Sequence, residues 1–207
     1  MRLKVLFSIL VCLVMQSALT AAQETKAYKL QIGNISVDID VDETIELKLP
    51  DGSTTNVKLS RNEFAAYVAA GFSFIHPSDV SVSESDIGDG ITQHLMATAR
   101  GTIVIVQEYT SVDPSSLTQF MLQEMTKEAV AAGAQVTQQP ATRKTPSGKT
   151  LSGLKAVEAG RTDTADYEVL TYGNSGAGLL VVTRLDREFA ATDRAMLAKF
   201  WETFDLK

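Results

Sequence analysis

Alternation of apolar and polar residues runs through the first quarter of the chain and predicts short strands. Four such segments, separated by turn residues, occupy 28–32, 35–41, 44–49 and 54–59. The turn Pro50-Asp51-Gly52 separates the last two, because proline presets one turn position and glycine accepts a positive φ. The pattern predicts a β-meander of about four strands over residues 23–59, with one face in solvent.

A helix is predicted next. Ser60-Arg61-Asn62-Glu63 has the spacing of a capping box, in which the serine and the glutamate each satisfy a backbone donor of the other. An alanine-rich apolar segment follows and ends at Gly71, a residue typical of a helix C-terminus. We therefore expect a short helix from about 61 to 70.

The stretch Gly71–Tyr109 predicts the start of the main sheet. Phe72 to Ile75 forms a strand that Pro77 ends, and the polar segment 78–90 holds a short edge strand near 80–82 and a loop. Two strands at 91–99 and 102–109 form a hairpin. The β-branched run in the second favours a strand that is covered on both faces.

Two amphipathic helices are predicted. The first has Asp113 as its cap, Pro114 in its first position and Gly133 beyond its end. Its apolar stripe consists of Leu117, Phe120, Met121, Met125 and Ala129. The second lies between 187 and 204, and its apolar face consists of Met196, Leu197, Phe200, Trp201 and Phe204.

Four further strands complete the pattern, at 134–138, 150–159, 167–173 and 178–184, with Pro140 closing the first of them. The sequence therefore predicts an α+β fold. A twisted, mainly antiparallel sheet is covered by a mid-chain and a C-terminal amphipathic helix, with the N-terminal β-meander as an appendage to a domain at 60–207.

From Gly71 onward the order of elements resembles the PsbP-like fold, over residues 71–207. This fold is named for the extrinsic P subunit of photosystem II and is shared with a Ran-binding nuclear import factor and with DcrB-type exported bacterial proteins. The resemblance rests on Phe72-x-Phe74-x-x-Pro77, the strand 102–109 before a long helix, the late strand pair, and Phe200-Trp201-x-x-Phe204. It implies a non-catalytic binding or assembly role and names no ligand.

The first 22 residues predict an exported protein. A basic start, an apolar run from Val5 to Met15 and small residues up to Ala22 are typical of a cleaved signal peptide, and the run is too short for a comfortable membrane span. The single cysteine, Cys12, lies inside this segment, so the mature chain has no disulfide or thiol chemistry. We expect a periplasmic or secreted location.

The charge balance disfavours a nucleic-acid partner. The chain carries 19 basic and 25 acidic residues, a net charge of −6, and loss of the signal segment removes Arg2 and Lys4 and leaves −8. Phosphate binding needs a basic face, which an acidic chain of this kind does not predict.

Asp38, Asp40 and Asp42 are the candidate metal ligands. Hard cations bind several carboxylate oxygens, but alternate residues of a strand project in a row rather than around one point. A calcium loop would also need glycine at 43 and glutamate at 49, where the chain has Glu43 and Leu49. A solvated strand face is favoured, with weak divalent-cation binding as an alternative.

Three short catalytic motifs fail in context, so we expect no cofactor and no catalytic residue. Gly148-Lys149-Thr150 lacks the first glycine of a phosphate loop and precedes a strand rather than a helix. Ser152-x-x-Lys155 lacks the companion motifs of penicillin-recognising enzymes, and Gly173 to Ala177 fits a hairpin turn. The two histidines, His76 and His94, show no spacing that predicts convergence on a metal or a nucleophile.

A protein partner is the expected ligand. The local basic cluster of Arg143, Lys144 and Lys149 is either a solvated hairpin tip or a docking point for an acidic partner. Asp86 and Asp89, in the loop 78–90, are further candidates for partner contact. The sequence thus predicts an exported, non-catalytic binding or assembly module, and the alternatives are a small-ligand carrier or hydrolase and a divalent-cation module.

Overall fold

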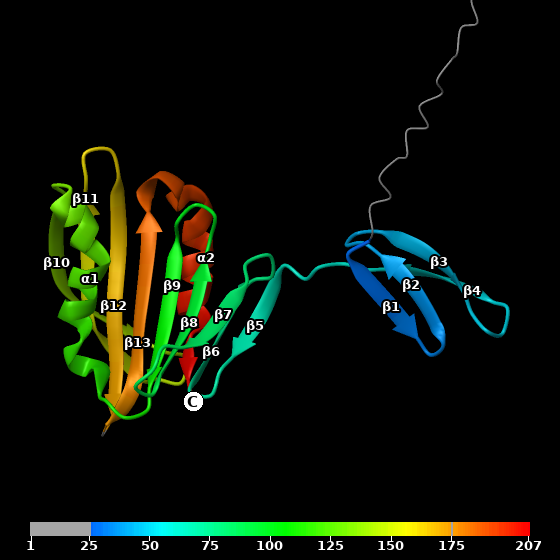
Figure 1. The fold of residues 1–207 in the computed structure, drawn as a ribbon, viewed down its shortest axis with the longest axis horizontal. Helices are drawn as coiled ribbons and strands as arrows, with labels where there is room; N and C mark the ends of the chain where they lie inside the picture. The colour runs from blue at the N-terminus through cyan, green and yellow to red at the C-terminus, as the bar shows by residue number, and fades with distance from the viewer. Residues whose placement is uncertain (1–25, 175) are drawn as a thin grey trace, which may run out of the picture. The chain divides into compact units, whose positions relative to one another are not determined.

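The computed structural model describes residues 26–174 and 176–207, so the predicted signal segment, with Cys12, lies outside the described residues. The chain divides into two compact units, one that ends at Ser60 and one that runs from Arg61 to Lys207. Figure 1 labels strands β1 to β13 and helices α1 and α2.

The first unit consists of two β-hairpins. Strands β1 (Tyr28–Ile32) and β2 (Ile35–Ile39) form one, and β3 (Thr44–Lys48) and β4 (Thr54–Lys58) form the other. The predicted strands are present, and they pair as two separate hairpins rather than as one four-stranded sheet. Between β2 and β3, Asp42 adopts a positive φ of 65° and its N–H donates to the Leu59 carbonyl, so the chain returns toward the end of β4 instead of pairing β3 with β2.

The predicted helix at 61–70 is wrong. Strand β5 (Phe64–Val68) lies there and pairs antiparallel with β6 (Phe72–Pro77), which also pairs with the short C-terminal strand β14 (Asp205–Leu206). Pairing with β6 overrides the helix propensity of the alanines. Gly71 does not cap a helix; its N–H donates to Glu108 Oε1 at 2.8 Å.

A seven-stranded antiparallel sheet forms the body of the second unit, in the order β10-β11-β12-β13-β9-β8-β7. Its strands are β7 (Val82–Asp86), β8 (Ile91–Ala97), β9 (Ile103–Tyr109), β10 (Gln135–Lys144), β11 (Thr150–Ala159), β12 (Thr164–Asn174) and β13 (Ala177–Asp186). The predicted edge strand near 80–82 lies further along the chain, at 82–86. Pro140 does not close β10 but lies within it, which is tolerated because β10 is at the edge of the sheet.

The first long helix, α1 (Thr118–Ala131), follows a 3-10 turn, η1 (Pro114–Ser116), whose cap Asp113 accepts a hydrogen bond from Ser115 N at 2.9 Å. Its predicted apolar stripe is wrong at Phe120, which is 58% exposed. Leu122 and Thr126 are the buried residues instead. Thr126 can be buried because its hydroxyl donates to the Leu122 carbonyl.

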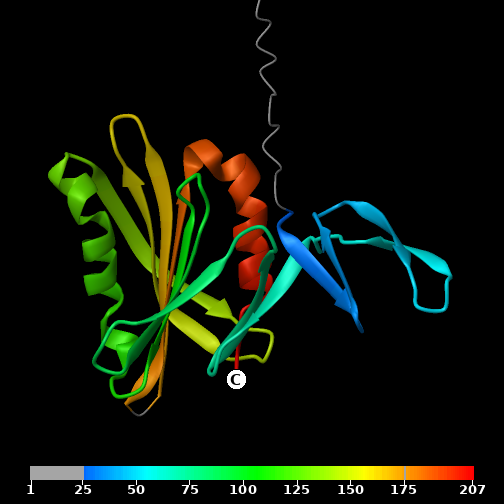
Figure 2. The same ribbon diagram turned by 45° about the vertical axis from the view of Figure 1, so that its right-hand side comes forward.

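Two hydrophobic clusters cover the two faces of the sheet, one under each helix. Leu122 of α1 packs with Val169 and Val182 on one face. On the other face, α2 (Ala190–Thr203), preceded by the turn η2 (Arg187–Phe189), brings Phe200 into contact with the second cluster. Figure 2 shows the sheet between the green helix α1 and the orange helix α2. The predicted α+β class is therefore confirmed.

Replacing Phe200 with alanine is expected to lower the free energy of unfolding by about 3–5 kcal/mol, because its fully buried ring contacts Phe74 and Phe204. The matched control is Phe120→Ala, which should change it by less than about 0.5 kcal/mol because that ring is exposed. Urea denaturation followed by circular dichroism measures both. Equal losses in the two variants would contradict this description of the core.

Candidate functional site

A groove of about 640 Å³ lies between α2 and the outer strands of the sheet. It exists because α2 packs on β6 and β13 and leaves part of the same face of β10, β11 and β12 uncovered. Its lining consists of Thr137, Gln138, Gln139, Arg143, Lys155, Ala156, Val157, Asp166, Tyr167, Glu168, Thr183, Leu185, Arg194, Leu197, Ala198 and Trp201.

The strand register builds the floor of this groove from two rows of side chains. In the first row, directly paired residues of β10, β11, β12 and β13 are Gln139, Lys155, Glu168 and Thr183. In the second row they are Thr137, Val157, Asp166 and Leu185. Paired residues of adjacent strands point to the same face of a sheet, so each row presents its side chains together.

Both acidic residues of the groove are paired. Arg143 binds Glu168 through two hydrogen bonds, from Nε at 2.5 Å and from Nη2 at 2.9 Å, and its guanidinium lies 4.6 Å from the ring centroid of Trp201. Asp166 accepts from Arg187, with Nη2 to Oδ1 at 2.7 Å. Two-point pairing of this kind fixes the geometry of both partners.

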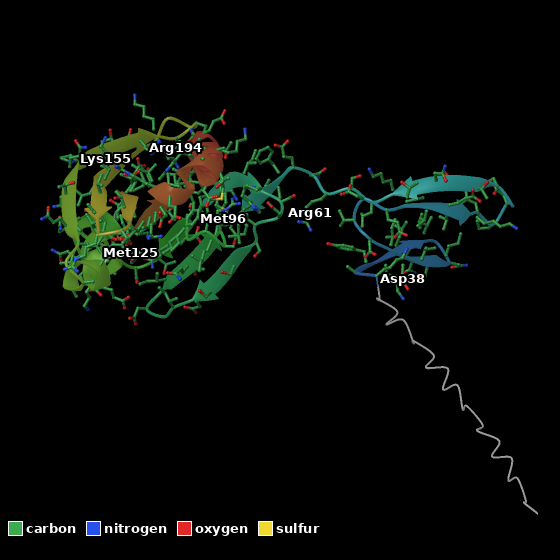
Figure 3. The ribbon with its side chains drawn as sticks, turned by 90° about the horizontal axis from the view of Figure 1, so that it is seen from above. Asp38, Arg61, Met96, Met125, Lys155 and Arg194 are labelled. Carbon is green, nitrogen blue, oxygen red and sulfur yellow. The ribbon has the colours of Figure 1, made fainter. Side chains whose placement is uncertain are left out.

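Two basic side chains of the groove remain without an ion-pair partner among residues 26–174 and 176–207. They are Lys155, on the floor, and Arg194, on α2, and both are exposed. Figure 3 labels Lys155 and Arg194 on the same side of the second unit. Because Asp166 and Glu168 are neutralised by arginines, the groove presents a positive charge in an otherwise acidic chain.

The residue before Arg194 anchors the start of α2. Asp193 is buried at the start of α2, where Thr98 Oγ1 donates to its Oδ2 at 2.7 Å and Arg100 Nη1 lies 3.6 Å from its Oδ1. Burial by itself would raise the pKa of Asp193, but the hydrogen bond from Thr98 and the charge of Arg100 contribute to a net pKa below its usual value. The carboxylate therefore ties α2 to the turn between β8 and β9.

The structure separates the three residues of the predicted basic cluster. Arg143 lines the groove and is paired, Lys144 is exposed at the end of β10, and Lys149 Nζ donates to the Lys207 carbonyl at 2.6 Å. Asp86 and Asp89 lie at and beyond the end of β7, and neither lines the groove.

The three candidate metal ligands of the first unit do not converge. Asp38 pairs with Lys29 at 3.6 Å, Asp40 accepts from the Ala27 N–H, and Asp42 lies 3.8 Å from Lys58. Within the described ranges, no three His, Cys, Asp or Glu side chains are grouped as a metal ion requires.

Both histidines lie in the hydrophobic interior and outside the lining of the groove. His76 Nδ1 is 2.9 Å from the Pro77 carbonyl. His94 Nδ1 is 2.8 Å from the Tyr67 hydroxyl, and its Nε2 lies 3.5 Å from Glu108 Oε2. They are therefore not placed to act on a ligand in the groove.

The groove residues Gln139, Lys155, Glu168 and Arg194 were not identified as a site from the sequence. These residues are far apart along the chain, and their proximity can be recognised only when the register of the strands is known. The detectable signal was the alternation in each strand, which predicts the face of a residue but not its neighbours.

Comparisons with known proteins give a likeness among solved structures. No protein-family model matches the chain. No curated protein matches it significantly. The solution structure of cyanobacterial PsbP (CyanoP) from Synechocystis sp. PCC 6803 is similar, with a TM-score of 0.47 and 11% identity, over 70% of this chain and 93% of that one. The chain resembles the PsbP-like fold, and the likeness concerns the fold alone.

In the part of the chain that is described, no helix has the length and apolar character to cross a membrane.

Asp193→Asn is expected to lower the free energy of unfolding at pH 7 by about 1–3 kcal/mol, because it removes a buried carboxylate that accepts a hydrogen bond. The folded-state pKa of Asp193 is depressed, so its contribution is present above the unfolded pKa and is lost as pH falls through the folded pKa. The difference in free energy of unfolding between the variant and the native chain should therefore shrink as the pH falls from about 5 to about 3. Urea denaturation across that range tests this, with the exposed Glu128→Gln as the control; a difference independent of pH would contradict it.

Proposed function

We propose that this chain is a non-catalytic binding module that holds an acidic, extended segment of a protein partner in the groove between α2 and β10–β12. One observation carries the proposal: Lys155 and Arg194 contribute unpaired positive charge from the floor and from α2, while arginines neutralise both acids of the groove. An acidic partner segment supplies the complementary charge.

The floor has the dimensions and chemistry for an extended peptide. Four adjacent strands about 4.8 Å apart span roughly 14 Å, the length of about four extended residues. Gln139, Thr137 and Thr183 offer hydrogen-bonding groups along the floor, and the partly buried ring of Trp201 offers an apolar surface. Such a groove combines orientation by hydrogen bonds with attraction by charge.

A small anionic ligand is the competing occupant, because a volume of about 640 Å³ falls in the range of small-molecule sites. The exposure of Lys155 and Arg194 favours the peptide, since small-molecule sites bury most of the surface of their ligand. A hydrolase would need a histidine or a comparable base beside a nucleophile, and His76 and His94 lie elsewhere.

We further propose that the chain acts in the periplasm or is secreted, on the basis of the signal-peptide pattern at 1–22. An acidic envelope protein or a subunit of an envelope complex would then be the partner.

Binding of a fluorescently labelled peptide with four consecutive glutamates tests the proposed function. The native chain should bind it with an affinity that falls as salt rises, and the double variant Lys155→Glu with Arg194→Glu should bind at least about tenfold more weakly, because two attractions become repulsions. The control is Lys127→Glu, a charge reversal on the exposed face of α1.

Two outcomes would contradict the proposal that the groove binds an acidic peptide. One is that the native chain and the double variant bind the glutamate peptide with equal affinity. The other is that the native chain binds a peptide with four lysines as tightly as the glutamate peptide. Complete displacement of the glutamate peptide by an equimolar amount of citrate would favour a small-ligand carrier instead.

A further inference from the structure

We infer that two copies of this chain associate by pairing strand β5 of one with strand β5 of the other. This inference concerns a surface that shares no residue with the groove and does not rest on the proposed function. Strand β5 is the edge of the sheet β14-β6-β5, so β6 is its single strand neighbour in the second unit. Its sequence, Phe-Ala-Ala-Tyr-Val, contains no charged residue.

The edges of the larger sheet carry features that discourage pairing, and β5 does not. Edge strand β10 contains Pro140 and ends with Arg143-Lys144, and edge strand β7 carries Glu84 and Asp86. Proline removes a backbone donor, and charges resist burial beside another strand. β5 thus lacks the protection that both edges of the larger sheet have.

The free hydrogen-bonding groups of β5 belong to Phe64, Ala66 and Val68. Ser78 N donates to the Glu63 carbonyl, and Ala69 N donates to the Phe72 carbonyl. Hydrogen-bonded and non-bonded pairs alternate in an antiparallel ladder, so residues 63, 65, 67 and 69 direct their N–H and C=O groups toward β6. The even-numbered residues between them direct theirs toward the open edge.

This set of free groups is symmetric about Ala66, as a two-fold dimer requires. In an antiparallel pair centred on Ala66, Ala66 faces Ala66 of the second copy, and Phe64 faces Val68 of the second copy. All of these are positions with free N–H and C=O groups, so each pair can exchange both backbone hydrogen bonds. The small alanine at the axis leaves room for its counterpart, and no like charges meet.

The side chains of the same residues favour this register. Val68 is 65% exposed and Phe64 is 38% exposed, which leaves apolar surface in water beside the partly exposed Ile75 of β6. Pairing places the Phe64 ring next to Val68 of the second copy, a combination of aromatic and β-branched residues that stabilises antiparallel strands. Both exposed side chains gain a neighbour.

The complementarity that favours a second copy over an unrelated strand belongs to the sequence of β5 itself. In this register Phe64 faces Val68 and Ala66 faces Ala66. At the ends of the strand, Glu63 lies opposite Ala69 of the second copy, so no like charges meet there.

Site-specific disulfide formation tests the pairing and its register in the full chain with Cys12→Ser, which removes the native cysteine. Ala66→Cys should form a covalent dimer under mild oxidation, because a hydrogen-bonded antiparallel pair holds its Cα atoms about 5.5 Å apart, within the range of a disulfide. Val68→Cys is the matched control. It is also exposed on the same face but lies opposite Phe64 and far from its own counterpart, so it should cross-link at least about tenfold more slowly.

A second measurement covers the chain without cysteine substitutions. Sedimentation of the native full chain should show a dimer that dissociates on dilution, and Ala66→Lys should remain monomeric because it places two like charges at the axis, whereas Ala66→Ser should still dimerise.

Three results would overturn the inference. They are a native chain that is monomeric at all concentrations, cross-linking of Val68→Cys as fast as that of Ala66→Cys, and a dimer that Ala66→Lys leaves unchanged. A monomeric chain would leave the β5 edge to a strand from another protein. Because the groove lies on other elements, Ala66→Lys should bind the glutamate peptide as the native chain does, so failure of this inference and failure of the proposed function are distinguishable.

Discussion

The contact between the aromatic face of α2 and strand β6 determines where the second unit has free surface. Phe200 of α2 meets Phe74 of the strand, and Phe204, directly after the helix, meets Phe72, with ring centroids 5.0 and 5.6 Å apart. These rings are fully or almost fully buried, so the helix is held over β6 and over β13, the central strand of the seven-stranded sheet. Everything that α2 does not cover on that face, from β10 to β12, becomes the floor of the groove.

The same contact orders the small sheet that carries β5. Thr203, at the end of α2, accepts a hydrogen bond from the Ile75 N–H, and the chain then adds β14 to the free side of β6. One side of β6 is thereby closed by the C-terminus of the chain, and β5 occupies the other. The unprotected edge of β5 and the charged groove are therefore separate consequences of one packing arrangement, and each presents different chemistry: backbone groups with apolar side chains in one case, and basic side chains on a polar floor in the other.

The sequence predicts the layers of this fold better than its edges. The face of α2 was predictable because Met196, Leu197, Phe200 and Phe204 recur at helical spacing. The segment that begins at Phe64 was not, because its apolar residues fit both a helix and a strand, and the choice is made by β6, which follows it in the chain. Thr126 counts as polar in a pattern, yet it is buried because a carbonyl four residues earlier satisfies its hydroxyl.

The groove could not be predicted from the sequence, for a different reason. Its first row joins Gln139, Lys155, Glu168 and Thr183, which lie on four strands and converge only through the register. The basic residues that stood out in the sequence, Arg143 and Lys149, are bound to other groups of the chain, whereas Lys155 and Arg194 are exposed in the groove.

The central claim is that partners bind in the groove beside α2, and site-specific photo-cross-linking in the cells that make this protein tests it most directly. A photoreactive residue at Ala198, which lines the groove, is compared with one at Phe120, which is exposed on the outer face of α1. The account predicts a cross-linked product of one defined mass from position 198, absent from position 120 and lost when Lys155 and Arg194 are reversed to glutamate. The same product from both positions, or its persistence after the charge reversal, would contradict the account.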